Sequence, residues 1–303
     1  MPRVLGQQLG LAHLPGWNIH RVDADPIDVN TAAAIATIVL HQRLQTIHSR
    51  LNSGEPLSIK LGTRAPLPKT PGTALSFDLT HRFKGRLATP NTWQDMVLPG
   101  LRAAVREIQS CAPNRNIELS GLVAIPLAVA LGSAFLSLSG IRTTWIQDQH
   151  SFGRASDAWG LHRVRETSGF QVATHARTVG ATDIAVLVSV AADVIADFNA
   201  TASTLPPLRA VVSVGRSTPI HGGRNVLSAG AALDVAQLTV DALRAARATY
   251  QITGTVHLFL AVPVGLAMMV GQLLNTFAGV QTYEHVPGAA TPYQPAALVT
   301  PSI

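Results

Sequence analysis

Two stretches of the chain, residues 119–140 and 258–280, contain no charged side chain over about 22 positions each. A single apolar helix of that length would span a bilayer. Each stretch, however, contains a proline and glycines, and changes from a half rich in branched residues to one rich in Ala, Leu and Met. A buried strand followed by a proline-initiated buried helix has this pattern, as in parallel α/β layers. We therefore predict α/β layers, with an integral membrane protein as the alternative.

The two stretches also belong to an internal repeat. Gly132 aligns with Gly271, and the same offset places residues 141–145 (IRTTW) over 280–284 (VQTYE), a short strand carrying an aromatic residue in each copy. The prolines fall two residues out of this register, so the alignment needs a small gap. Each copy is preceded by a further strand and helix, and strand–helix–strand–helix–strand occurring twice predicts two Rossmann-like halves with parallel-type sheets.

The flanking segments supply the remaining predicted elements. Strands are expected at residues 57–61, 74–79, 183–190 and 209–214, and helices at 31–51, 93–109 and 228–250, the last with Ser228 as its N-cap. The chain then divides into an N-terminal element with a proline-rich linker (1–72), a first unit (73–152), a connector (153–180) and a second unit (181–303).

The net charge of +6 is carried mainly by arginine, with 20 Arg against 3 Lys. Arginine makes bidentate contacts to phosphate or carboxylate, so a basic pocket for a compact anion fits, while GC-rich codon usage is the alternative explanation. The absence of a long basic run argues against duplex DNA binding. One cysteine, Cys111, excludes a disulfide scaffold, and together with the lack of an apolar N-terminal signal it predicts a cytoplasmic protein.

No GxSxG, HExxH or CxxC motif is present, and the eleven histidines have no metal-ligand spacing. We therefore predict no catalytic residue, no cofactor and no metal site. Ligands of doubly wound sheets bind beyond the carboxyl ends of the strands, which singles out two loops, residues 80–86 (THRFKGR) and 215–224 (GRSTPIHGGR). A solvated basic turn is the alternative for the first loop, and a flexible surface loop for the second.

The candidate ligand-binding residues come from these loops, from the strand-to-helix turns and from the two matched strands. In chain order they are Thr80, His81, Arg82, Phe83, Lys84, Arg86, Pro126, Trp145, Gln147, Arg216, Ser217, Thr218, Arg224, Pro263 and Tyr283. The arginines and Lys84 are candidates for phosphate, Ser217 and Thr218 for hydrogen bonding, and the aromatic rings Trp145 and Tyr283 for stacking on bases.

Several of these segments resemble a known family. Residues 77–86 (FDLTHRFKGR), Trp93 and 97–101 (VLPGL) are similar to the opening of a SAVED domain, and 256–263 (VHLFLAVP), 271–272, 280–284 and 293–295 to its C-terminal signature. The resemblance covers roughly residues 15–300. It implies two fused CARF-like Rossmann units related by a pseudo-twofold axis, which agrees with the repeat found independently.

The resemblance also implies a function: a sensor of cyclic oligonucleotide second messengers in CBASS or type III CRISPR antiphage defence. A cyclic tri- or tetranucleotide, of the adenylate type, would lie between the two units and drive oligomerisation, often head-to-tail. Relatives carry an effector such as a nuclease, a TIR domain or a protease. Because the similarity begins near residue 15, we expect the effector on another chain or outside this sequence. A metal-independent ring nuclease cleaving such ligands is the alternative, and neither a membrane nor duplex DNA is an expected partner.

Overall fold

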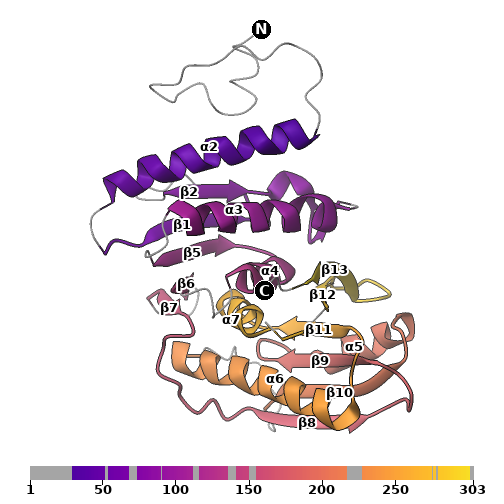
Figure 1. Ribbon diagram of the computed structural model, residues 1–303. Helices are drawn as coiled ribbons and strands as arrows, with labels where there is room; N and C mark the ends of the chain where they lie inside the picture. The colour runs from indigo at the N-terminus through magenta and orange to yellow at the C-terminus, as the bar shows by residue number, and fades with distance from the viewer. Residues whose placement is uncertain are drawn as a thin grey trace.

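A computed structural model of the chain shows two α/β layers that stack on one another (Figure 1). It describes residues 29–51, 54–67, 74–89, 91–111, 116–135, 141–149, 155–216, 227–274, 276–277 and 279–300. Mixed sheets with mainly parallel strands confirm the predicted α/β class.

The first layer is built on a sheet with the strand order β2-β1-β5-β6-β7. Its strands are β1 (Leu57–Gly62), β2 (Leu75–Asp78), β5 (Ile117–Leu122), β6 (Thr143–Gln147) and β7 (Asp157–Trp159), and its helices are α2 (Val29–Arg50), α3 (Leu98–Cys111) and α4 (Ile125–Ala134). All neighbours pair in parallel except β7, which is antiparallel to β6. A small hairpin of β3 (Phe83–Lys84) and β4 (Leu87–Ala88) follows β2 and leads into a π-helix, η2 (Thr92–Val97).

The second layer has the strand order β13-β12-β11-β9-β10-β8. Its strands are β8 (Gln171–Ala176), β9 (Asp183–Ser189), β10 (Leu208–Gly215), β11 (Val256–Ala261), β12 (Val280–His285) and β13 (Tyr293–Val299), and its helices are α5 (Ile195–Thr201), α6 (Ala229–Tyr250) and α7 (Val264–Leu273). The two central strands β9 and β11 are buried along nearly their whole length. This is expected of parallel strands covered on both faces.

The internal repeat is visible in the order of the strands. The order β2-β1-β5-β6-β7 of the first sheet recurs in the second as β10-β9-β11-β12-β13, with the last strand antiparallel in both. Strand β1 belongs to the sheet of the first unit, although its segment was predicted to be part of the N-terminal element. The predicted connector also contributes strands, β7 to the first sheet and β8 to the second. Strand pairing is non-local, so the local pattern of these strands did not reveal their sheets.

The two layers meet where helices α4 and α7 cross, between the sheets in Figure 1. A Cβ atom added to Gly132 would lie 2.0 Å from the carbonyl oxygen of Met268, and one added to Gly271 would lie 2.2 Å from that of Val129. The contact is therefore reciprocal, and it is made by the glycine pair that the repeat alignment matched. Nearly all of α4 and α7 is buried in this contact, which accounts for the two uncharged stretches.

Within the described residues, no helix combines the length and the apolar character needed to cross a membrane.

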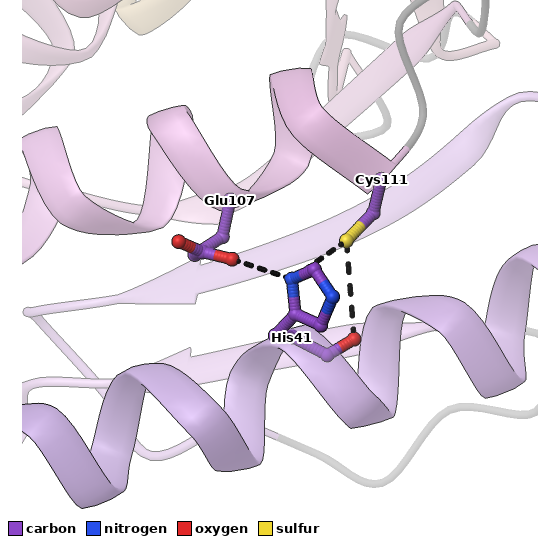
Figure 2. A group of neighbouring side chains, drawn as sticks. All are labelled: His41, Glu107 and Cys111. Carbon is purple, nitrogen blue, oxygen red and sulfur yellow. Dashed lines mark hydrogen bonds and ion pairs between the residues drawn. The ribbon is translucent and has the colours of Figure 1, made fainter.

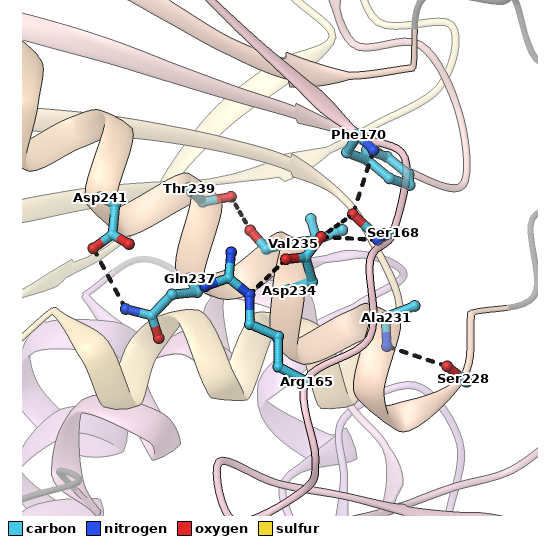
Figure 3. A network of polar contacts seen from close by, with 10 residues as sticks. All are labelled: Arg165, Ser168, Phe170, Ser228, Ala231, Asp234, Val235, Gln237, Thr239 and Asp241. Atoms are coloured by element: carbon cyan, nitrogen blue, oxygen red, sulfur yellow. Dashed lines mark hydrogen bonds and ion pairs between the residues drawn. The ribbon is translucent and has the colours of Figure 1, made fainter.

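The connector is fastened to α6 by hydrogen bonds to the buried carboxylate of Asp234 (Figure 3). Arg165 Nε donates to Oδ1 at 2.6 Å, and the backbone N–H and hydroxyl of Ser168 donate to Oδ2 at 2.9 and 2.5 Å. Ser228 caps α6 as predicted, accepting from Ala231 N at 3.1 Å. These contacts fix the first turns of α6. In the sequence, α6 follows the second predicted loop, residues 215–224.

Replacing Asp234 by asparagine should lower the free energy of unfolding by roughly 1.5–3 kcal/mol, the range for hydrogen bonds to a charged group. Burial raises the pKa of Asp234, but the hydrogen bonds from Ser168 and Arg165 outweigh it, so the net pKa is lowered. A lowered pKa means that the stabilisation is present above about pH 4 and is lost as the pH falls through the folded-state pKa. Urea unfolding of both proteins at pH 7 and pH 3 checks this: equal differences at the two pH values would contradict it.

Candidate ligand-binding cleft

The carboxyl ends of strands from the two sheets meet at one place between the layers. Arg64 follows the end of β1, and its Nη2 donates to Oε1 of Glu284, near the end of β12, at 2.5 Å. Ligands of α/β sheets bind beyond such strand ends. The place between the two units where a ligand is predicted is therefore one where strand ends from both sheets lie together.

A cavity of about 230 Å³ opens at this junction. The first unit contributes the β3–β4 hairpin and the beginning of η2, and the second contributes β12 and β13. The lining residues are Arg86, Leu87, Ala88, Thr89, Asn91, Trp93, Gln94, Glu284, Pro295 and Ala296. The volume is below the roughly 300–1,000 Å³ of pockets that enclose a drug-sized ligand. A larger molecule could therefore place only a part of itself inside the cavity.

Glu284 is the most unusual residue of this cavity, because it is an acid that is only 4% exposed. Burial raises the pKa of its carboxyl group, against the opposing effects of Arg64, Arg86 and His285. Its Oε2 and the Nη1 of Arg64 are buried without a hydrogen-bond partner. Buried polar atoms are rarely left unpaired, so this ion pair has an acceptor and a donor that the rest of the protein does not satisfy.

The first predicted loop borders the cavity. Arg86 lines it, and its Nη1 donates to the backbone oxygen of His285 at 3.3 Å. The Phe83 ring meets the ring of Trp93 edge-on at 5.6 Å, and thereby supports a residue of the cavity wall. Arg86 is therefore the predicted residue of this loop that lines the cavity.

The other predicted residues of this loop do not line the cavity. Thr80 hydrogen-bonds through both its backbone N–H and its hydroxyl to Asp78, and these bonds lower the pKa of that carboxyl group. His81 and Lys84 are exposed, and Arg82 is half-buried with an Nε that has no hydrogen-bond partner.

The second predicted loop lies at a different strand. Arg216 follows the end of β10, donates to the backbone oxygen of Ser168 at 3.3 Å and places its guanidinium 5.0 Å from the centre of the Phe170 ring. Three strand spacings separate β10 from β12, about 14 Å of sheet. Ser217, Thr218 and Arg224 lie outside the described residues.

The two aromatic candidates are both in the core. Trp145 is 1% exposed and packs against Gly265 at the start of α7, while Tyr283 is 5% exposed and bonds through its hydroxyl to His257 Nδ1 at 2.8 Å. The Tyr283 ring is stacked on Phe259, 4.2 Å between ring centres, on the sheet face away from the cavity. Contrary to the expectation from the sequence, neither ring therefore lies where a base could stack on it. For Tyr283 the reason is that side chains alternate along a strand, so that Glu284, not Tyr283, faces the cavity.

The remaining candidates belong to the contact between the units. Pro126 is buried in the first turn of α4, and Pro263 is the N-cap residue of α7. Gln147 Oε1 accepts from the backbone N–H of Gly265 at 3.1 Å and so satisfies one of the unpaired amides at the start of α7. In the structure these three residues hold the helices that join the layers.

Sequence reasoning missed Arg64, Trp93 and Glu284 as cleft residues. A signal existed for Glu284, because the constant repeat offset places it over Trp145 and both side chains face the opposite unit. Trp93 stood among the residues that resembled a family motif. Arg64 lay in a proline-rich segment read as a linker and had no signal of its own.

Comparisons with known proteins give one family and one fold. Residues 101–299, about two thirds of the chain, match the SMODS-associated and fused to various effectors sensor domain, SAVED. Among proteins of curated function, none matches the sequence significantly. Similar folds are found in two solved structures of the Acinetobacter baumannii Cap4 SAVED/CARF-domain containing receptor, both at 16% identity and a TM-score of 0.63.

One of these receptor structures holds the cyclic trinucleotide 3′3′3′-cAAA and the other 2′3′3′-cAAA; they cover 82% and 88% of this chain, and 52% and 55% of the receptor. The Moraxella osloensis Cap4 receptor is similar at 19% identity and a TM-score of 0.58, covering 82% of this chain and 50% of its own. The chain thus spans about half the length of these receptors. At such identities the likeness establishes the shared fold.

Proposed function

Because this chain belongs to the SAVED family of sensor domains, we propose that it is a receptor for a cyclic oligonucleotide second messenger in antiphage defence. The observation that carries the proposal is the cavity between the two units, with the buried acid Glu284 among its lining residues. The Oε2 of Glu284 has no hydrogen-bond partner in the protein, and a ligand in the cavity would supply one when the side chain turns toward it.

We assign complementary roles to three side chains of the cleft. Glu284 accepts a hydrogen bond from the exocyclic amino group of a base through Oε2, and Arg64 positions it through Oε1. Arg86, at the mouth of the cavity, contacts the adjoining phosphate. The cavity then takes one base, and the rest of the ring lies across the cleft toward Arg82 and Lys84.

The preferred ligand we propose is a ring of three adenylates, with the tetramer as the next candidate. Support comes from the similar receptors, which hold cyclic trinucleotides of adenine. Adenine also carries the amino group that a carboxylate can accept from.

A thermal-shift panel of cyclic di-, tri- and tetranucleotides tests the proposal. Binding to the folded state raises the unfolding temperature, by an amount equivalent to about 2.7 kcal/mol at a ligand concentration one hundred times Kd. We expect cyclic tri-adenylate to give the largest shift and dinucleotides none. If no ring stabilises the protein at high micromolar concentration, the receptor proposal fails.

Two further readouts on the same samples separate receptor from enzyme. We propose that the ligand drives self-association, which would activate an effector on another chain or elsewhere in a longer protein. Light scattering at saturating ligand should then give a larger mass than without ligand. Chromatography after overnight incubation should recover intact ring. Cleaved ring would instead support a ring nuclease, in which the ribose 2′-hydroxyl attacks the neighbouring 3′-phosphate, a 2′,3′-cyclic phosphate forms, and the 5′-oxygen of the next nucleotide leaves and takes up the proton. The cleft arginines would stabilise the charge on the phosphate.

A further inference from the structure

Helices α2 and α3 bring together three metal-binding side chains far from the cleft (Figure 2). Glu107 and Cys111 stand four residues apart on α3, so both project from one face of that helix. His41 on α2 points between them. Among the described residues, these three form a group that could hold a metal ion, because their ligand atoms all lie within 4.8 Å of one another.

Two of the three contacts in the cluster meet at Nδ1 of His41, and in the third the thiol of Cys111 donates to the backbone oxygen of His41 at 3.9 Å. Oε2 of Glu107 lies 2.8 Å from it and Sγ of Cys111 lies 3.3 Å from it. A neutral imidazole has one N–H, so if Nδ1 donates to Glu107 it cannot also accept the thiol proton of Cys111. If Nδ1 carries no hydrogen, its lone pair faces the carboxylate. A cation between the three atoms would satisfy all of them at once.

We propose that His41, Glu107 and Cys111 form a zinc site that joins α2 to α3. Zinc binds imidazole nitrogen, carboxylate oxygen and thiolate sulfur, and three protein ligands leave a fourth position for water. Tetrahedral bonds of the usual lengths put the ligand atoms about 3.4–3.6 Å apart. The Nδ1–Oε2 pair therefore has to open by about 0.6 Å from its 2.8 Å contact, within reach of a glutamate side chain.

The surroundings of the cluster fit this assignment. Nε2 of His41 lies 2.9 Å from the side-chain amide of Gln45, one helical turn away. In the other orientation of that amide its oxygen would accept the Nε2–H, which is how metal-bound histidines are commonly held. All three ligands are only half-buried, so an ion can enter and water can occupy the fourth position.

A zinc ion here would add to the apolar packing of α2 on the first unit, in which Leu40 also takes part. Leu44 and Ile47 of α2 are buried, and the flanking residues at 45–46 and 48–49 are exposed. One ion bound by both helices would hold α2 on the first unit. No metal site was expected from the sequence, because His41 and Glu107 are 66 residues apart and no spacing rule links them.

Cobalt(II) titration of the full chain, without a histidine tag and with a phosphine reductant, tests the site. Cys111 is the single cysteine, so a thiolate-to-cobalt charge-transfer band in the near ultraviolet reports on this cluster alone. We expect the band to saturate at one equivalent of cobalt and to be displaced by zinc. Absence of the band in the wild-type protein would overturn the proposal, whatever the outcome of the ligand panel.

Three variants locate the ligands. Cys111→Ser should abolish the band, and His41→Ala should weaken cobalt binding at least tenfold, while His48→Ala, an exposed histidine of the same helix, should leave it unchanged. Circular dichroism of each variant confirms that it is folded. Binding that is equal in His41→Ala and the wild type would show an unrelated thiol site and would also overturn the assignment.

Discussion

Replacing Glu284 by glutamine should weaken binding of the preferred adenine ring by roughly ten- to a hundredfold. That range corresponds to about 1.5–3 kcal/mol for a hydrogen bond to a charged group in a water-poor site. Glu284 is almost fully buried, and its Oε2 has no partner within the protein. Isothermal titration with cyclic tri-adenylate measures the change. Affinity within twofold of the wild type would remove Glu284 from the binding site.

A change of base preference separates recognition from a general weakening of the fold. A ring with hypoxanthine in place of adenine replaces the amino group by a carbonyl oxygen. Carboxylate can only accept, so the wild type should discriminate against this ring, whereas the glutamine amide can donate to it and the discrimination should be lost. Arg64→Lys alters the ion pair but keeps a cation beside the carboxylate, so its preference should stay with adenine. Glu118→Gln, in β5, is the neutral control.

The duplicated architecture was predictable from the sequence because it rests on local features. The uncharged strand–helix stretches, the prolines at the helix starts and the matched glycines are each visible within a short window. Their meaning follows from simple physics: helices buried on all sides carry no charge, and helices that cross closely need a residue without a side chain at the crossing. Gly132 and Gly271 meet that need in the structure.

The cleft was predictable only in part, because its chemistry depends on pairs that are distant in sequence. Arg86, which lines the cavity, could be selected from the sequence because it follows a strand, and the rule for such loops is local. The contact of Arg64 with Glu284 spans 220 residues, and no local pattern links the two. Tyr283 attracted attention as an aromatic residue, whereas its neighbour Glu284 did not, since acids are rarely buried. The alternation of side chains along β12 decides which of these two neighbours faces the cavity. It can be applied only when it is known which face of the sheet lies toward the other unit.

Replacing Gly132 by alanine should lower the free energy of unfolding by about 3 kcal/mol, the upper end for overpacking. The new Cβ would lie 2.0 Å from the backbone oxygen of Met268 and 2.8 Å from the backbone nitrogen of Gln272. Backbone atoms of a buried helix cannot turn aside as a side chain can, so α4 and α7 must move apart. Urea unfolding compares the variant with the wild type.

Gly100→Ala in α3 is the matched control, because a Cβ there meets no atom within 4 Å. Replacing a glycine inside a helix by alanine raises the free energy of unfolding by about 1 kcal/mol. The Gly100→Ala control should therefore be more stable than the wild type, whereas Gly132→Ala should be less stable. Gly271→Ala should reproduce the loss. The double variant should lose less than the sum, because both substitutions open one contact. Additive losses would contradict the reciprocal crossing. Since α4 and α7 also hold the two sheets together, their separation should weaken ligand binding in a variant whose cleft residues are all intact.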